Sequence, residues 1–342
     1  MKKLFVLLAS LLLLASAPAQ AQNILRCNNV GVTGTGIFAT LQAAHDAAAS
    51  GDIIYLEPSG LTYGNLNCAK PLTIIGNGYL HAERTPLLVA DPRASVVGQV
   101  FFRLGSAGSR ITGVTVTDIL LVNATNVVVE RNRIQTNGLR IGSDNISTGA
   151  PAVITAGIIR QNILEGLVFT MGGSTSVSNV LVDNNIIVNT IGGGNSSNLN
   201  GVLFSNNVIG NKAGTGGGDI DVDNCVLKNN IVTRAAATFL PRLNAFSNNL
   251  STGTQFGTAS GNQQNVALAT IFGSATGTET QFEITVGGPA DNTGEGGADC
   301  GVFGGGRPYI LSGVPNVPAI FEYAQTVSGT TLNATISTRS NR

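Results

Sequence analysis

A short pattern that ends in asparagine recurs six times in the middle of the chain, and this repeat restricts the fold more than any other feature. The final asparagines follow one another at steps of 30, 23, 22, 23 and 19 residues. Each follows a short apolar run, and no helical period lies between the runs. A period near 22 residues built from short strands predicts a β-solenoid, whose coils stack as parallel strands about 4.8 Å apart. The six asparagines are Asn132, Asn162, Asn185, Asn207, Asn230 and Asn249.

Alignment on these asparagines gives columns of constant character. The residue three places before the asparagine is always apolar, and the residue two places before it is always polar, so the first faces inward and the second outward. We expect the asparagines themselves to form a structural ladder at a coil corner, where they accept left-handed backbone angles and hydrogen-bond unpaired peptide groups. The alternative is a polar row that binds a ligand, which requires outward side chains.

Two further columns are apolar where strict alternation does not require it. One lies four places before the ladder asparagine and the other one place after it. We expect the C-terminal segment to cover these columns, and another chain or an apolar ligand is the alternative. The first column is Val128, Ile158, Leu181, Leu203, Val226 and Ala245, and the second is Ile163, Ile186, Val208, Ile231 and Leu250.

The charge of the chain is low and balanced. Lys and Arg together number 19, as do Asp and Glu, and charged residues make up 11% of the sequence. This composition excludes a disordered charged tail, and it argues against nucleic-acid binding, which needs a basic stripe. The hydrophobic share is 43% with only 5% aromatic residues, which indicates a β-structured core of small branched side chains.

The N-terminus has the features of a secretory signal. Two lysines precede an apolar run, and a small-residue cleavage site follows at Ala19–Ala21, so residues 1–21 are predicted to be removed. The apolar run is too short to span a bilayer, and no later segment is long enough. We therefore expect a secreted, periplasmic or outer-surface protein with no membrane span after signal removal.

The four cysteines have no zinc-site spacing. Outside the cytoplasm they are able to pair, and we expect a disulfide between Cys27 and Cys68, which bracket one N-terminal unit. Cys225 and Cys300 form a second candidate pair. Alternatively, Cys225 is a small buried hydrophobic residue, because it falls in an inward column.

Three alternating carboxylates form the best candidate metal site. Asp219, Asp221 and Asp223 share one face of a strand, because side chains alternate along a strand with a period of two. Calcium is the cation that carboxylate oxygens would hold there. A solvated outward strand face is the alternative interpretation. No other cofactor is expected.

The region that follows the predicted secretory signal carries a helix pattern and a family resemblance. Thr40 is a predicted N-cap for a short amphipathic helix that ends before Gly51 and covers the first coil. This opening consists of Thr40–Ala44, Gly51–Leu56, Tyr63–Gly64 and Lys70–Gly76, and the Asn-Asn coils follow it. Together these segments resemble right-handed parallel β-helix proteins of the pectin-lyase-like superfamily.

The resemblance implies an all-β, right-handed parallel β-helix with an N-terminal capping helix. Many members of this superfamily are polysaccharide lyases or hydrolases, but the Asn-Thr-Asp, Asp-Asp, Gly-His-Gly and Arg-Ile-Lys motifs of the galacturonan hydrolases are missing from this sequence. No catalytic residue is therefore assigned. We expect residues 22–255 to form the β-helix and 256–342 a C-terminal β cap or appended module.

The expected function is that of a non-catalytic structural or binding protein. Its partner would be an extracellular polysaccharide or another cell-surface molecule. The alternative is a calcium-dependent polysaccharide lyase or other carbohydrate-active enzyme.

Overall fold

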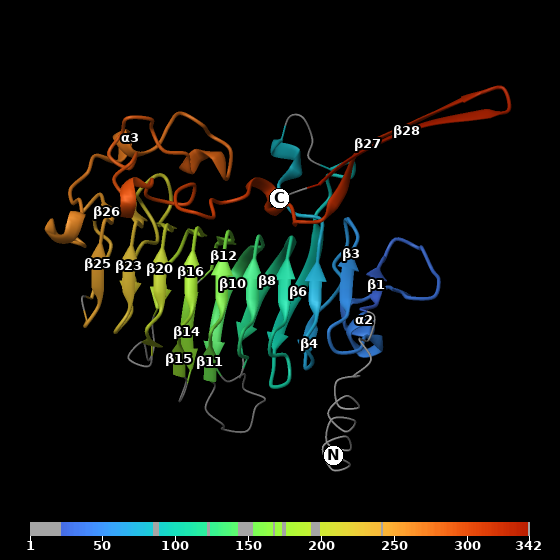
Figure 1. The fold of residues 1–342 in the computed structure, drawn as a ribbon, viewed down its shortest axis with the longest axis horizontal. Coiled ribbons are helices and arrows are strands. Elements are labelled where there is room, and N and C mark those ends of the chain that lie inside the picture. Colours follow the sequence, from blue (N-terminus) through green and yellow to red (C-terminus); the bar gives the residue numbers. More distant parts are fainter. Residues whose placement is uncertain are drawn as a thin grey trace, which may run out of the picture.

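A computed structural model describes residues 22–84, 89–121, 124–142, 153–166, 168–172, 176–192, 199–240 and 242–340, so the predicted signal at 1–21 lies outside the described residues. The fold is all-β, with mostly parallel stacked strands and few helices, as the sequence predicts (Figure 1). The chain visits the sheets in turn and returns to each of them, an arrangement compatible with a β-solenoid.

Three parallel sheets make up the stack. The first has eleven strands in the order β2 (Ile37–Phe38), β1 (Ile24–Cys27), β3 (Ile53–Leu56), β5 (Thr73–Ile75), β7 (Arg110–Thr112), β9 (Val128–Glu130), β12 (Ile158–Arg160), β16 (Leu181–Asp183), β20 (Leu203–Ser205), β23 (Val226–Lys228) and β25 (Ala245–Ser247). The second contains β4 (Leu66–Cys68), β6 (Ser95–Phe102), β8 (Val114–Leu121), β10 (Arg133–Gly142), β13 (Ile163–Leu164), β14 (Val168–Gly172), β17 (Ile186–Ile187), β18 (Ile191–Gly192), β21 (Val208–Ile209), β22 (Ile220–Asp221), β24 (Ile231–Val232) and β26 (Leu250–Ser251). The third pairs β11 (Val153–Thr155), β15 (Ser176–Ser178) and β19 (Leu199–Asn200).

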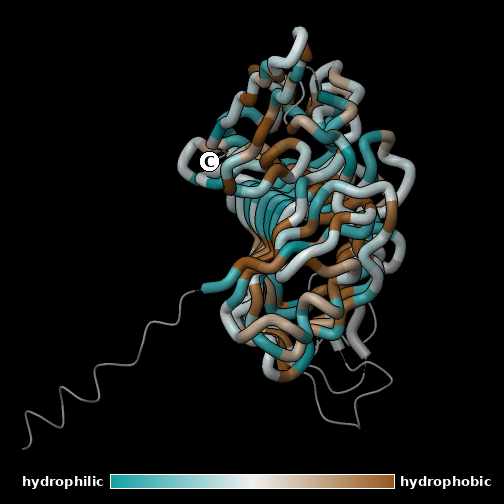
Figure 2. Tube along the Cα trace, turned by 90° about the vertical axis from the view of Figure 1, so that its right-hand side faces the viewer, coloured by the Kyte–Doolittle hydropathy of each residue, from teal (hydrophilic) through white to brown (hydrophobic). Residues whose placement is uncertain are grey.

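The register of the eleven-stranded sheet follows the sequence columns. Ile159 pairs with Val129 on one side and Val182 on the other, and Arg160 pairs with Glu130 and Asp183 in the same way. The inward column is buried from Val129 to Leu227, and only its last member, Phe246, is partly exposed. In Figure 2, which looks along the stack, the coils superpose and hydrophilic and hydrophobic positions form separate columns.

A short helix lies against the first strands. Helix α2 (Leu41–Ala47) begins after Thr40, whose side chain accepts a hydrogen bond from the backbone N–H of Ala43 at 3.2 Å. Its apolar residues Leu41 and Ala44 are fully buried in the main core. None of the helices among the described residues is long and apolar enough to cross a membrane.

The structure places the six ladder asparagines in one buried row, each with no exposed surface. The side-chain oxygen of each asparagine from Asn162 to Asn249 accepts from the backbone N–H of the previous one at 2.9–3.0 Å. Each side-chain nitrogen donates to a strand carbonyl and to the next asparagine, as Asn207 does to Val182 and Asn230 at 2.9 Å. The row continues one step further to Asn262, beyond the last recognised repeat.

The left-handed backbone lies one residue earlier than expected. The residue before each ladder asparagine, and not the asparagine itself, has φ between 53° and 56°. We call these residues, which stand one place before the ladder asparagines, the outward column, because their side chains leave the core. They are Arg131, Gln161, Asn184, Asn206, Asn229 and Asn248. The polar residues two places before the asparagines are a separate set.

The segment that follows the coils, which we call the tail (residues 256–317), runs back along the stack. Its irregular path contains α3 (Leu268–Ile271) and the 3₁₀ turns Ala259–Gly261, Thr280–Phe282, Glu295–Gly297 and Leu311–Gly313, and another 3₁₀ turn, His81–Glu83, lies in the N-terminal part. The sequence of Gln281–Val286 is strand-like, but this stretch forms a 3₁₀ turn and a single antiparallel bridge, so the strand prediction is wrong. Ala319–Val327 and Thr331–Ser337 are also strand-like, joined by Ser328-Gly329-Thr330, and the hairpin that they predict is present as β27 (Pro318–Ser328) and β28 (Thr331–Ser340).

The tail covers one of the two unexplained apolar columns. Ile163, Ile186, Val208, Ile231 and Leu250 are 0–1% exposed and form a second core with Phe272, Phe282, Val302 and Tyr309 of the tail. The column on the eleven-stranded sheet is not covered, because Val226 is 40% exposed and Leu181 and Leu203 are partly exposed. The expectation that the tail covers both columns is therefore wrong for the column from Val128 to Ala245.

The outward column holds the tail through its side chains. Asn184 Nδ2 donates to the carbonyls of Val302 and Gly304 at 2.8 Å, and Gln161 Nε2 donates to that of Pro308 at 2.6 Å. The other members contact Val314, Asp299, Glu295 and Thr293 in the same reversed order. From its place beside the ladder, Asn206 is predicted to face solvent or the turn surface, but it is only 6% exposed because its side chain bonds to the tail.

Asn184→Gly is expected to lower the free energy of unfolding by about 1–3 kcal/mol, because two buried carbonyls lose their donor. Glycine adopts the left-handed conformation freely, so the change removes the side chain without adding backbone strain. Chemical denaturation measures the loss, and limited proteolysis should show earlier cleavage between Val302 and Arg307. Asn126→Gly, also left-handed but not bonded to the tail, is the matched control. Equal effects of the two changes would contradict the role given to Asn184.

The expected disulfides are not formed: all four cysteines lie in the described residues as buried free thiols. Cys27 belongs to the eleven-stranded sheet and Cys68 to the twelve-stranded sheet, and their sulfur atoms contact different backbone carbonyls, of Thr40 and Lys70. Burial raises the pKa of Cys27 and that of Cys225 to about 12. Cys225 therefore behaves as a buried hydrophobic residue, and Cys300 contacts the carbonyl of Asn248.

Candidate ligand-binding face

Polar residues form a row on the outward face of the eleven-stranded sheet. They occupy the column two places before the ladder asparagine, where the pairing of β9, β12, β16, β20 and β23 sets them side by side. Neighbours in such a row are about 4.8 Å apart, so their charges interact directly. The row is Glu130, Arg160, Asp183, Ser205, Lys228 and Ser247.

Glu130 is the most firmly held member of the row. Its carboxylate is 1% exposed and lies between Arg110 and Arg160, with the Arg160 Nη2 at 2.6 Å. Burial acts to raise the pKa of this carboxyl, but the two guanidinium groups outweigh it and the pKa is lowered. Glu130 therefore stays ionised, and its carboxylate is already paired with two guanidinium groups.

Asp183 differs from Glu130 although it stands only two strands away. It is 8% exposed, and its Oδ1 atom is buried without a hydrogen-bond partner among the described residues. Burial raises its pKa from 3.8 to about 6, although the positive charges of Arg160 and Arg307 oppose the rise. A carboxyl group whose pKa is shifted towards neutral pH is a common feature of functional sites.

A small cavity opens next to this part of the row, between the sheet and the tail. It has a volume of about 190 Å³, and the side chains around it include Arg131, Arg160, Gln161 and Arg307. Arg131 Nε donates to Gln161 Oε1 at 3.0 Å, and Arg160 is paired with Glu130, so these groups are fixed. Arg307 is exposed at the same cavity, where its guanidinium is able to meet an anionic group.

A second cavity lies further along the same face, near the N-terminal end. Its volume is about 430 Å³, and Arg26 and Tyr55 of the sheet line it together with Val317 and Ile320 of the C-terminal segment. Since β3 and β12 are four strands apart in the sheet, the two cavities are separated by about 19 Å. The same stretch of chain, residues 307–320, borders both.

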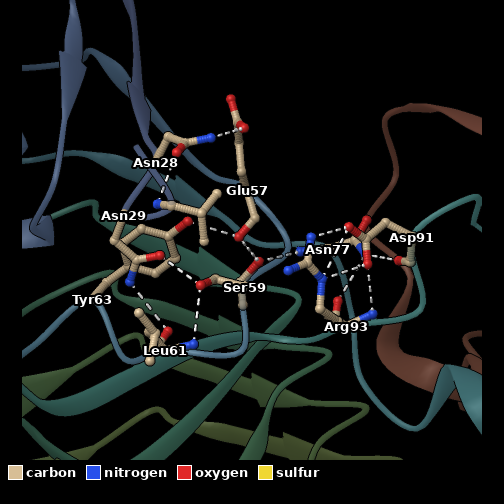
Figure 3. A network of polar contacts seen from close by, with 11 residues as sticks. Asn28, Asn29, Glu57, Ser59, Leu61, Tyr63, Asn77, Asp91 and Arg93 are labelled. Atoms are coloured by element: carbon tan, nitrogen blue, oxygen red, sulfur yellow. Dashed lines mark hydrogen bonds and ion pairs between the residues drawn. The ribbon is translucent and has the colours of Figure 1, made fainter. Parts of the chain in front are cut away.

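A polar network stiffens the loops around the second cavity (Figure 3). Asn28 Nδ2 donates to Glu57 Oε2 at 2.6 Å, and Glu57 is also paired with Arg26. On the other side, Asn77 Nδ2 donates to the Asp91 carbonyl at 2.9 Å. Because these charged groups are already bonded to one another, the cavity mainly offers Tyr55 and aliphatic surface to a ligand.

The candidate calcium residues lie on a different part of the molecule and are not brought together as a metal site. Asp219 contacts Arg234 at 3.3 Å, and Asp221 contacts Arg242 at 3.1 Å. Ile220 and Val222, which alternate with the three aspartates, are buried in the core, while the aspartates are partly exposed. Within the part of the chain that the structure describes, no group of three or more His, Cys, Asp or Glu side chains is able to hold a metal ion.

No sequence pattern marks Asp183 or Arg307 as a functional residue. Asp183 is one member of a polar column, and its burial depends on the overlying tail. Arg307 follows three glycines in a segment without periodicity, so no pattern marks it.

Comparison with known proteins adds no relative. No family model matches the chain, and no curated protein matches it in sequence.

Proposed function

We propose that this chain is a secreted, right-handed parallel β-helix that binds an extended extracellular polysaccharide on the outward face of its eleven-stranded sheet. The stacked parallel strands and the resemblance of residues 38–255 to the pectin-lyase-like superfamily support the fold. The predicted signal at residues 1–21 supports export.

The observation that carries the binding proposal is the pair of cavities on one sheet face beneath one stretch of tail. A ligand that occupies both must extend over about 19 Å, which suits a polymer better than a small metabolite. Arg307 at one cavity favours a sugar that bears a carboxylate, and Tyr55 at the other offers an aromatic ring to a sugar face. The preferred ligand is therefore an acidic polysaccharide.

Arg307→Ala is expected to weaken binding of an acidic oligosaccharide at least tenfold, because a charge-assisted contact is lost. A glycan array that includes oligogalacturonates, oligoglucuronates and neutral cello-oligosaccharides identifies the ligand, and isothermal titration calorimetry measures its affinity. Arg103→Ala changes the net charge equally, but Arg103 lies at the twelve-stranded sheet, and it should leave the affinity unchanged. Equal affinities for all three proteins, or an array without an acidic ligand, would contradict the proposal.

A carbohydrate-active enzyme is the second candidate, and Asp183 is the observation that favours it. A carboxyl with a pKa of about 6 and an unpartnered oxygen suits a general acid or base. The nearest buried carboxylate in the row, Glu130, is held by two arginines and is a poor second catalytic group. Release of reducing ends or unsaturated products from the bound glycan, lost in Asp183→Asn, would establish an enzyme and overturn the non-catalytic proposal.

A further inference from the structure

Two apolar surfaces of the described chain face solvent beside the cavities. The first is the uncovered column of the eleven-stranded sheet, which we call the sheet stripe. It consists of Val128, Ile158, Leu181, Leu203, Val226 and Ala245. The second is one face of the C-terminal hairpin formed by β27 and β28.

The hairpin has one apolar and one polar face. Tyr323 pairs across the ribbon with Ile336, and Val327 pairs with Leu332, so these four side chains share one face. They are 54%, 57%, 73% and 60% exposed, respectively. The opposite face carries the pairs Glu322–Ser337, Thr326–Asn333 and Ser328–Thr331.

Such a ribbon needs a surface to lie on. A two-stranded hairpin alone is at best marginally stable in water, and strands gain stability when an apolar face is packed against another layer. The sheet stripe is a suitable layer, because successive strands hold its members in register from Val128 to Ala245. Flat sheet faces of this kind pack on one another about 10 Å apart.

The hairpin of one chain does not lie on its own stripe. It leaves the body beside β1 and β3 and extends beyond that end of the stack, whereas β12 to β25 lie in the other direction (Figure 1). We propose that the hairpin packs its apolar face on the sheet stripe of a second copy of this chain, and that the exchange is reciprocal in a two-fold dimer.

The area available favours reciprocal exchange over a single contact. Eleven residues give a ribbon about 36 Å long, and two strands make it about 10 Å wide, so one hairpin contact buries about 700 Å² on both sides together. Stable interfaces bury about 1,200–2,000 Å², which one contact does not reach and two contacts, at about 1,400 Å², do. Face-to-face packing of two hairpins would supply only the smaller area.

The sheet stripe and the polar row lie on the same outward face, two places apart along each strand, so a hairpin seated on the stripe borders the polar row. The cavity at Arg307 lies on the tail side of that row, because its sheet residues stand one and two places before the ladder asparagine, whereas the stripe stands four places before it. Arg307→Ala is therefore expected to weaken glycan binding without changing the mass in solution.

The first test is the mass of the full mature chain by sedimentation velocity over a range of concentrations. The intact protein is expected to dimerise, and Val327→Asp and Val226→Asp are each expected to give monomers, since a buried charge opposes packing at either surface. Thr326→Asp, on the polar face of the same strand, is the matched control and should remain dimeric. A wild-type protein that stays monomeric at all concentrations, or a Val327→Asp variant that still dimerises, would overturn the proposal.

The second test identifies what the hairpin touches, even if an aspartate variant folds poorly. Chains carrying Val327→Cys and differently sized chains carrying Val226→Cys are mixed and oxidised. A disulfide between the two kinds of chain is expected. Cross-links mainly between two Val327→Cys chains would show hairpin-to-hairpin packing, and a double variant that cross-links only within monomers would show closure on its own stripe. Either result would overturn the proposal.

Discussion

Replacement of Asn207 by alanine is expected to lower the free energy of unfolding by about 3–5 kcal/mol. Its Oδ1 accepts from the backbone N–H and the side chain of Asn185, both at 3.0 Å, and its Nδ2 donates to Val182 and Asn230 at 2.9 Å. Alanine leaves these partners buried without a bond and away from water, where each unsatisfied group costs about 1–3 kcal/mol. Urea denaturation followed by circular dichroism measures the loss.

The control for this prediction is Asn333→Ala, on the exposed polar face of the hairpin, which should change the stability by less than about 0.5 kcal/mol. A loss at Asn207 no larger than that of the control would show that the ladder contributes little. If the slope of the free energy of unfolding against urea concentration also falls, part of the stack is already unfolded in the variant.

Asp183→Asn is expected to stabilise the protein at pH 7.5 by about 3 kcal/mol. The folded-state pKa of Asp183, about 6, lies above its ordinary value of 3.8, so folding favours the protonated form. The stability that comes from the protonated Asp183 is fully present below about pH 4 and is lost as the pH rises through about 6. Asparagine is never charged and avoids this loss.

Thermal unfolding of both proteins between pH 4 and pH 8 tests the prediction. The two curves of stability against pH should nearly coincide near pH 4, diverge between about pH 4 and pH 6, and run parallel above that. Asp46→Asn serves as the control, because Asp46 is exposed and its hydrogen bonds to His45 and Gln42 lower its pKa, so its removal should bring no gain at pH 7.5. An Asp183→Asn protein that is equally or less stable at pH 7.5 would contradict the burial assigned to this carboxyl. A gain in stability with a loss of glycan binding is the pattern of a functional group.

The stacked strands were predictable because each coil repeats the same physical problem. Val129 and Val182 occupy equivalent inward positions, and the repeat of the pattern reveals the register before any contact is known. The left-handed residue was harder to assign, since an Asn-Asn pair offers two similar side chains. In the first two of the six repeats the left-handed position is taken by Arg131 and Gln161, which shows that it does not require asparagine.

The path of the tail was not predictable from residue types. Its hydrogen bonds to the outward column use mostly backbone carbonyls, such as those of Val302 and Pro308. Because every residue has a backbone carbonyl, no residue type marks these contacts. The burial of Asp183 and the position of Arg307 both depend on that path. The cysteine pairing failed for a similar reason, because closeness in sequence did not reveal that Cys27 and Cys68 belong to different sheets.

The antiparallel course of the tail has a consequence for how such a chain is able to change in length over evolution. From Asn248 back to Arg131, each coil is matched by its own contact in the tail, which advances by only a few residues per coil, from Thr293 to Val314. Duplication or deletion of one coil would therefore shift every later contact out of step unless the tail gained or lost a matching stretch. Solenoids usually vary their repeat number freely. In this protein the length of the tail restricts the number of coils, and insertions within a coil should be confined to the loops on the side away from the tail.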